Sequence, residues 1–322
     1  MFTIVKDAKN GMRRPSARSF PRLLILLSCL LFQWAASGQA RAADPYVFNG
    51  GRAFEDLQHL VAYGPRPPGS KALEASRQWI IGQLKAAGCV VKQDRFVAST
   101  PVGDIPMVNL IAEIPGKAPD KIVMIAGHYD TKLENDFRFV GANDGGSSAA
   151  FLLELARELR PTKHKLTYWL VFFDGEEAIK NWTDTDSLYG SRHLAAKLTQ
   201  DGELSRIQAM ILVDMIGDAH LDIDWDQDST AWLNKLVFQQ ADKLGYSKYF
   251  LRQTIVMDDD HIPFVNAGVS AVDLIDFDYG PNNIYWHTAQ DLPEHCSPSS
   301  LTIVGRVVRA TLDELENSPH IQ

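Results

Sequence analysis

Six apolar stretches of this chain have the length and composition of buried strands, and amphipathic stretches alternate with most of them. The strand-like stretches cover residues 89–96, 107–114, 121–127, 166–173, 209–215 and 270–275. The helical patterns cover residues 70–88, 147–159, 186–198, 230–244 and 300–315. Alternation of this kind is typical of a parallel sheet with helices on both faces. We therefore predict an α/β fold, a three-layer sandwich with a mostly parallel central sheet flanked by helices.

Polar residues follow the predicted strands at the points where they end. His128-Tyr129-Asp130 follows one strand, FFDGEEA (residues 172–178) ends another, and Asp214 follows a third. Acids after a strand often form only the solvated first turn of a helix, where they suit the helix dipole. Their recurrence favours a site instead, because the carboxyl ends of strands in open α/β sheets are where sites are built.

Two further segments add metal-binding residue types. Asp144 lies in a glycine-rich turn, GANDGGSSAA (141–150), and His287 lies in the WHT segment 286–288. The combined set is His128, Asp144, Glu177, Asp214 and His287. A catalytic zinc needs three or four N or O ligands with one open position, and two zinc ions that share a carboxylate need about five, so this set suits either. Glu176 would remain free to move protons.

Longer motifs carry a family resemblance. The stretches YGPRPPGS (63–70), FFDGEEA with DSLYGSRHLAAK (186–197), DDHIPF (259–264) and WHT resemble the glutaminyl cyclase branch of the zinc aminopeptidase family, peptidase family M28. The resemblance extends from about residue 52 to residue 315. It implies a glutaminyl-peptide cyclotransferase, which converts N-terminal glutaminyl residues of peptides to pyroglutamate with release of ammonia.

The resemblance also implies roles for single residues. One zinc ion would be held by Asp144, Glu177 and His287, and Glu176 would be the general acid and base. Asp259, Asp214 and Trp286 would line the reaction centre. The indoles of Trp286 and Trp182 are expected to wall a small, dry pocket, although either indole also suits an ordinary core position.

Alternative interpretations stay open at the level of sequence. A secreted dizinc aminopeptidase would use His128 and Asp214 for a second zinc ion, and a non-catalytic ectodomain of the same fold is a third interpretation.

Compared with the cyclases, the loop 276–285 carries two extra acids, Asp276 and Asp278, which we expect to change the surroundings of the substrate beyond its first residue. We expect Asp174 to support its turn and His261 to pack or orient its loop.

The N-terminal segment is typical of an export signal. Basic residues precede the apolar run 23–34, and Ala40-Arg41-Ala42 has the small-x-small pattern that signal peptidase cuts. The run is shorter than the roughly 20 residues that span a bilayer, so an uncleaved anchor is the less favoured interpretation. We predict a signal peptide over 1–42, a single zinc-dependent catalytic domain over 43–322, a periplasmic or secreted location, and no stable membrane association after cleavage.

Charge limits the partners. Residues 1–42 hold seven of the 32 Lys and Arg and one of the 40 Asp and Glu, which leaves 25 basic against 39 acidic residues and a net charge near −14. Nucleic acid is therefore not an expected partner. We expect a monomer that acts on peptide or protein N-termini. Cys89 and Cys296 remain, and the sequence does not decide whether they pair.

One acidic segment imitates a calcium loop. DIDWDQD (222–228) has alternating acids, but the glycine and glutamate that such a loop needs are replaced by Gln227 and Leu233. We interpret the segment as an acidic surface loop.

Overall fold

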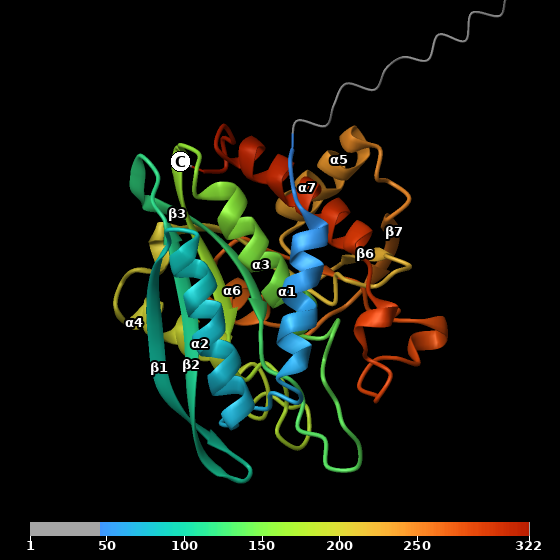
Figure 1. The fold of residues 1–322 in the computed structure, drawn as a ribbon. Coiled ribbons are helices and arrows are strands. Elements are labelled where there is room, and N and C mark those ends of the chain that lie inside the picture. The colour runs from blue at the N-terminus through green and yellow to red at the C-terminus, as the bar shows by residue number, and fades with distance from the viewer. Residues whose placement is uncertain (1–45, 322) are drawn as a thin grey trace, which may run out of the picture. The chain divides into compact units, whose positions relative to one another are not determined.

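A computed structural model of the protein describes residues 46–321. Its main feature is a six-stranded sheet with the order β1-β2-β4-β3-β5-β8 (Figure 1). The strands are β1 (Val90–Thr100), β2 (Gly103–Ile114), β3 (Ala118–His128), β4 (Leu166–Phe173), β5 (Ile207–Asp214) and β8 (Ala271–Ile275). Strands β4, β3, β5 and β8 are parallel, whereas β2 runs antiparallel to both of its neighbours, β1 and β4. The predicted mostly parallel α/β sheet is confirmed, with an antiparallel edge.

Helices cover both faces of this sheet. One face packs against α1 (Gly50–Ala62), α2 (Lys71–Ala86), α3 (Gly146–Leu159), α5 (Ala231–Leu244) and α7 (Pro298–Leu315). The other face packs against α4 (Tyr189–Gln200) and α6 (Ile262–Asn266). Short 3₁₀ turns lie at Leu204–Arg206, Pro281–Asn283 and Pro293–His295.

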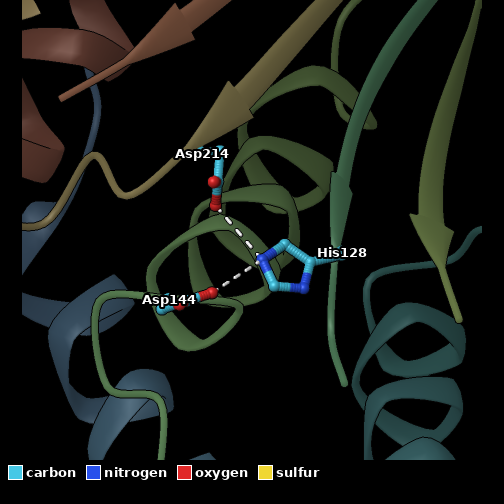
Figure 2. Close-up of side chains that lie close together, drawn as sticks. All are labelled: His128, Asp144 and Asp214. Atoms are coloured by element: carbon cyan, nitrogen blue, oxygen red, sulfur yellow. Dashed lines mark hydrogen bonds and ion pairs between the residues drawn. The ribbon is translucent and has the colours of Figure 1, made fainter. Parts of the chain in front are cut away.

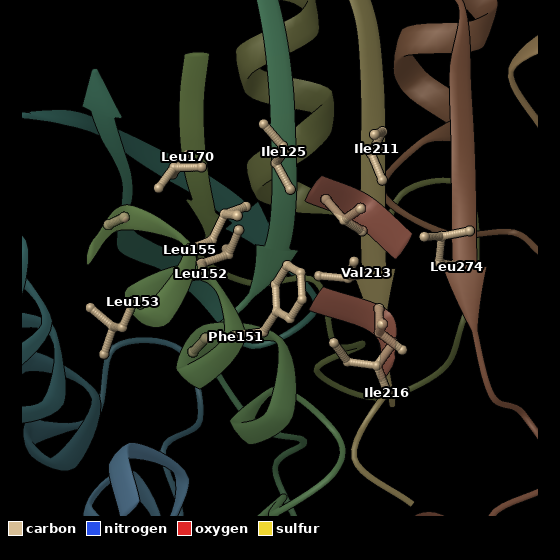
Figure 3. Close-up of a cluster of buried hydrophobic side chains, with 14 of the residues drawn as sticks. Ile125, Phe151, Leu152, Leu153, Leu155, Leu170, Ile211, Val213, Ile216 and Leu274 are labelled. Atoms are coloured by element: carbon tan, nitrogen blue, oxygen red, sulfur yellow. The ribbon is translucent and has the colours of Figure 1, made fainter. Parts of the chain in front are cut away.

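Strand β4 shows why the sheet must be covered on both faces. Successive side chains of a strand point to opposite faces. Tyr168, Leu170 and Phe172 belong to the larger core, while Trp169, Val171 and Phe173 belong to the smaller one. Figure 3 shows Leu170 and Ile125 of the sheet facing Phe151 and Leu155 of α3. A strand that is apolar at every position therefore lies in the middle of the fold.

Local signals set the ends of the predicted helices. The Ser70 hydroxyl accepts a hydrogen bond from the Leu73 N–H at 3.1 Å, so it caps α2 as predicted. Gly88 follows α2 with a φ of +87°, a left-handed conformation that favours glycine. Helix α4 begins at Tyr189, three residues later than predicted, because the Asp186 carboxylate instead accepts the N–H groups of residues 179–181.

The structure corrects the sequence analysis in the segment 222–228. Ile223–Asp226 is strand β6, which pairs in parallel with β7 (Phe250–Ile255) in a second, two-stranded sheet. Asp224 and Asp226 are buried, so the predicted acidic surface loop is wrong. Asp226 accepts hydrogen bonds from the N–H groups of Asp228 and Met257 and from the Ser229 hydroxyl, which compensate its burial.

Three further observations concern the whole described region. Helices α1 and α6 and strand β7 were not predicted. Cys89 and Cys296 are both buried with free thiols, so they do not pair in this structure. Within residues 46–321, no helix combines the length and apolar character needed to span a bilayer. The predicted signal segment lies outside the described residues.

Candidate functional site

The predicted site residues gather where the parallel strands end. His128 is the last residue of β3 and Asp214 is the last residue of β5. The segment Asp174–Glu177 directly follows β4, which pairs with β3 through His128 and Phe173. This register brings segments more than forty residues apart in the chain to one edge of the sheet.

One group of three residues is centred on His128. The Nε2 atom of His128 lies 3.2 Å from Asp214 Oδ1 and 3.3 Å from Asp144 Oδ1 (Figure 2). Figure 2 shows the ring reaching from the end of β3 toward Asp214 on β5 and toward Asp144 in the loop before α3. All three residues are buried. The other ring nitrogen, Nδ1, has no hydrogen-bond partner within residues 46–321 and faces Asp130 and Glu176 at 3.5 and 3.7 Å.

A second group of three shares Asp144 with the first. His287 Nε2 lies 3.1 Å from Glu177 Oε1 and 3.2 Å from Asp144 Oδ2. Burial alone lowers the pKa of His287, but Glu177 and Asp144 raise it to about 10. Two oxygens of this buried group, Asp144 Oδ2 and Glu177 Oε2, accept no hydrogen bond from any described residue. Asp144 thus faces one histidine with each of its carboxylate oxygens.

These unpartnered oxygens test whether the residues suit a metal ion. Zinc bonds of about 2.0–2.1 Å in a tetrahedron place neighbouring ligand atoms roughly 3.3 Å apart. The distances from His287 to its two carboxylates, 3.1 and 3.2 Å, agree with this spacing. Buried carboxylate oxygens without hydrogen bonds are costly unless a cation compensates them. The residues Asp144, Glu177 and His287 therefore fit a zinc ion.

Backbone strain is concentrated around this site. His287 and Met215 have φ values of +51° and +48°, and Leu188 has +52°, all in the left-handed region. Residues that carry a Cβ atom rarely adopt this backbone conformation unless surrounding contacts impose it, and residues strained in this way cluster at functional sites. Met215 follows Asp214 directly, and its N–H donates to Asp214 Oδ1 at 2.8 Å. The strained backbone therefore includes His287 itself and the residue that directly follows Asp214.

Two residues that the sequence analysis did not single out hold the Asp144 turn. The Asp291 carboxylate accepts the N–H groups of Asn143 and Asp144 at 2.7 and 3.2 Å. Arg66 is fully buried and donates to the carbonyls of Val140 and Gly141 at 2.8 and 3.1 Å. Arg66 belongs to the motif YGPRPPGS, and Asp291 lies four residues after His287, but neither position has a periodic signal that would mark its role.

Glu176 occupies a buried position beside the metal-binding groups. Its N–H donates to Asp130 Oδ1 at 3.2 Å, which fixes the turn after β4. Burial raises the pKa of Glu176 well above its usual value, Glu177 and Asp259 raise it further, and His128 opposes them. Burial and the nearby Asp214 also raise the pKa of Asp259, to about 7. Asp259 can therefore hold or release a proton near neutral pH, and Glu176 binds a proton more tightly than a free carboxyl does.

The site opens into a cavity of about 300 Å³. Its lining includes all the predicted catalytic and substrate-binding residues, namely Glu176, Asp214, Asp259, Trp182 and Trp286, with Asp144 and Glu177 of the metal-binding group. Trp286 packs against Phe277 at 4.9 Å and stacks on His287 at 4.1 Å between ring centroids. Trp182 is 41% exposed, and its indole N–H donates to Asp258 Oδ2 at 2.8 Å. The indole N–H of Trp182 is therefore engaged at the rim of the cavity.

Asp174 and His261 take the places expected of them, whereas the two acids of the loop 276–285 lie outside the reaction cavity. Asp174 is buried beneath the turn, where Oδ2 accepts the Val108 N–H and pairs with Arg77. His261 lies 3.2 Å from Asp226, so it contacts β6 from the loop that carries Asp259. The extra acids of the loop 276–285 do not line the reaction cavity. Asp276 is buried and accepts hydrogen bonds from the N–H groups of Asp222 and Asp278, whereas Asp278 is exposed and lines a different hollow.

Comparison with known proteins agrees with this geometry. The sequence pattern of peptidase family M28 matches residues 109–312. Glutaminyl-peptide cyclotransferase of Dictyostelium discoideum is 33% identical over 67% of this chain and 71% of its own length. That of Boiga dendrophila is 32% identical over 78% of each chain. The chain belongs to the glutaminyl cyclase branch of peptidase family M28.

Solved structures of glutaminyl cyclases have the same fold. The enzyme of an Acidobacteriales bacterium is 42% identical, covers 85% of this chain and 96% of its own, and superposes with a TM-score of 0.81. The Porphyromonas gingivalis glutaminyl cyclase is 30% identical over 83% of this chain and 98% of its own, with a TM-score of 0.76. A Zn-dependent exopeptidase of Parabacteroides distasonis, 26% identical over 86% of this chain and all of its own, has a TM-score of 0.75. The resemblance found in the sequence is confirmed.

Proposed function

We propose that this chain is a glutaminyl-peptide cyclotransferase that converts N-terminal glutaminyl residues to pyroglutamate and releases ammonia. The observation that carries the proposal is the position of Glu176, a buried carboxyl of raised pKa in the same cavity as Asp144, Glu177 and two indoles. A cavity of about 300 Å³ suits one extended side chain and its α-amine. The relatives named glutaminyl-peptide cyclotransferase support the same activity.

The proposed cofactor is one zinc ion held by Asp144, Glu177 and His287. When bound, zinc supplies a Lewis acid that polarises the amide carbonyl of the substrate. The support for this site is the pair of buried oxygens, Asp144 Oδ2 and Glu177 Oε2, that accept no hydrogen bond from a described residue and lie beside the ring nitrogen of His287. The structural neighbour from Parabacteroides distasonis is a Zn-dependent exopeptidase, which is consistent with this choice of metal.

The proposed chemistry then depends on Glu176. The α-amine of the glutaminyl residue attacks its own side-chain amide carbon, so that one C–N bond forms and the bond to the amide nitrogen breaks. Glu176 accepts the proton that the amine loses and donates it to the departing nitrogen, which leaves as ammonia. A carboxyl whose pKa is raised by burial suits both steps, because it accepts a proton more readily than a free carboxylate and can still pass it on.

Other residues of the cavity have supporting roles in this proposal. Asp259 and Asp214 line the cavity beside Glu176, where the charge of Asp214 raises the pKa of Asp259 and the charge of Asp259 raises the pKa of Glu176. Trp286 and Trp182 wall the cavity, and their rings exclude water that would compete with the amine as a nucleophile.

A dizinc aminopeptidase is the second candidate, and one observation favours it. His128, Asp144 and Asp214 form another group whose ligand atoms all lie within 4.8 Å of one another. Asp144 would bridge this group and the zinc site at His287, as a dizinc centre requires. In the cyclotransferase, His128 instead orients the carboxyls around it.

We also propose the export and assembly state that the sequence analysis predicts. Residues 1–42 would be a cleaved signal peptide and residues 43–322 a single catalytic domain, periplasmic or secreted, acting as a monomer on peptide or protein N-termini. The acidic balance of residues 43–322 argues against nucleic acid as a partner.

A mass-spectrometric assay separates the two candidate activities. The purified protein with zinc is incubated with a peptide that begins with glutamine and with matched peptides that begin with other residues. We expect the first peptide alone to lose the mass of one ammonia without shortening. Release of free N-terminal amino acids from several peptides would instead establish the aminopeptidase and assign His128 and Asp214 to a second zinc ion.

A further inference from the structure

The rim of the reaction cavity carries an acid, Asp258, that the proposed reaction does not use. Asp258 lines the reaction cavity and also a second hollow of about 230 Å³. The second hollow is further lined by Asp184, Ser187, Leu188, Arg192, Ile262, Pro263 and Asn266. Asp258 is therefore a residue that borders both hollows.

The carboxylate of Asp258 is held in place but keeps its charge available. Trp182 Nε1 donates to Asp258 Oδ2 at 2.8 Å, so the indole fixes the carboxylate at the rim. Asp258 is exposed, and none of the cationic side chains within residues 46–321 forms an ion pair with it. An oriented, unpaired carboxylate at a cavity mouth is suited to a cationic group of a ligand.

The nearest cation in the lining does not neutralise this acid. Arg192, the basic residue of the second hollow, donates to the Ser187 carbonyl through Nε and Nη2 at 3.0 and 2.7 Å. Its guanidinium also lies over the Tyr189 ring at 5.1 Å. Arg192 therefore braces its own loop, whereas Asp184 adds a second acid to the hollow.

The wall beside Asp258 is apolar. Val256, Met257 and Phe277 line the reaction cavity next to it, and Val256 is 64% exposed. Lysine and arginine combine an apolar stem with a charged head, so they match an apolar wall that ends in a carboxylate. A glutamate in the same place would bring two like charges together.

We propose that Asp258 is a specificity-determining residue that favours peptides with lysine or arginine directly after the N-terminal glutamine. This inference rests on the proposed function, because the glutaminyl residue would fill the cavity at Glu176 and the next residue would leave through the mouth. At low salt we expect kcat/KM for a Gln-Lys peptide to exceed that for the matched Gln-Glu peptide by about tenfold. This ratio combines the attraction of lysine to Asp258 with the repulsion of glutamate from Asp258, each of the size found at solvent-exposed sites.

The test uses three peptides that differ only in the second residue, which is lysine, methionine or glutamate. Ammonia release gives kcat and KM for the zinc-loaded wild type, Asp258→Asn and Asp201→Asn. Asparagine can still accept the Trp182 hydrogen bond but has no charge, so we expect the Lys-to-Glu ratio to fall to about two in Asp258→Asn. Asp201 is an exposed acid just after the far end of α4, and its variant should keep the wild-type ratio.

The division of the effect between kcat and KM and its dependence on salt provide two further tests. Since Asp258 is at the rim and not at the reacting carbon, the discrimination should lie mainly in KM and should weaken as salt rises. This salt effect can be measured on the wild type even if Asp258→Asn does not fold. Equal kcat/KM for the lysine and glutamate peptides in the wild type, or an unchanged ratio in folded Asp258→Asn, would overturn the inference. Absence of ammonia release from all three peptides would refute the proposed function instead.

Discussion

The Asp291 carboxylate fixes the turn that presents Asp144, and its replacement gives a quantitative prediction. Oδ1 accepts the Asn143 N–H at 2.7 Å and the Tyr279 hydroxyl at 3.0 Å, while Oδ2 accepts the Asp144 N–H at 3.2 Å. Asp291 and its three partners are buried, so water does not replace any bond that is lost.

The variant Asp291→Asn keeps the shape of the side chain but replaces one acceptor oxygen by an NH₂ group. The N–H of Asn143 or Asp144 then faces a donor. Loss of a hydrogen bond to a charged acceptor costs about 1.5–3 kcal/mol. Because a buried N–H is also left without an acceptor, we expect a cost near the upper end of this range. We therefore expect a loss of about 3 kcal/mol in the free energy of unfolding. Changes in such supporting contacts typically weaken metal binding by about 10- to 100-fold, which we expect for zinc here.

The assay is competition for zinc with a chromophoric chelator, together with thermal unfolding. Burial and the neighbouring Asp144 raise the pKa of Asp291 to about 7, so the comparison is made above that pH, where the wild-type carboxyl is ionised. Tyr279→Phe is the matched control, because it removes one of the three bonds and leaves both turn contacts in place. Its zinc affinity should stay within about threefold of the wild type.

One result would refute this reasoning. If Asp291→Asn unfolds at a lower temperature but binds zinc as tightly as the wild type, the carboxylate stabilises the loop without determining the position of Asp144. An equal loss of zinc affinity in Tyr279→Phe would also contradict it, because the effect would then not depend on the contacts to the turn.

Three further predictions concern proton transfer, pH and the metal. Glu176→Gln should lower kcat by about 10²- to 10⁴-fold while zinc content stays at the wild-type value; loss of zinc with activity would make Glu176 a ligand. Burial raises the pKa of Asp276 to about 8, so the folded state binds its proton more tightly than the unfolded state. The wild type should therefore lose about 1 kcal/mol of stability per pH unit relative to Asp276→Asn as the pH rises from about 4 to 8, measured by chemical denaturation; parallel curves would contradict this. Chelation should abolish activity and lower the melting temperature by roughly 10 °C, with both restored by zinc; a chelated protein that remains fully active would exclude a metal role.

The sequence was informative wherever function or burial imposed a local pattern. Strand β4 is apolar at every position because both its faces are covered, and that run was readable without coordinates. The acids after it, Glu176 and Glu177, were recognisable because three carboxylates follow the strand within four positions. Ser70 and Gly88 marked the ends of α2 by the chemistry of capping.

Other features depend on contacts between segments that are distant in the chain. The segment 222–228 was misread because alternating acids are usually exposed, whereas Asp226 is compensated by N–H groups from Asp228 and, thirty-one residues away, Met257. Asp291, Arg66 and Asp258 were missed for the same reason. Each acts through partners that no local pattern reveals, such as Asp258 with Trp182.

The sequence by itself determined the six strands of the main sheet and five of the helices, the strand ends that carry chemistry, and the ligand types available for zinc. Only the tertiary structure decided that Asp144 faces both histidines, that the Trp182 N–H binds Asp258, and that Cys89 and Cys296 stay apart. The physical reason is that secondary structure and burial follow from the period of neighbouring side chains, whereas a site is made by distances between residues that the parallel register of β4, β3 and β5 brings together.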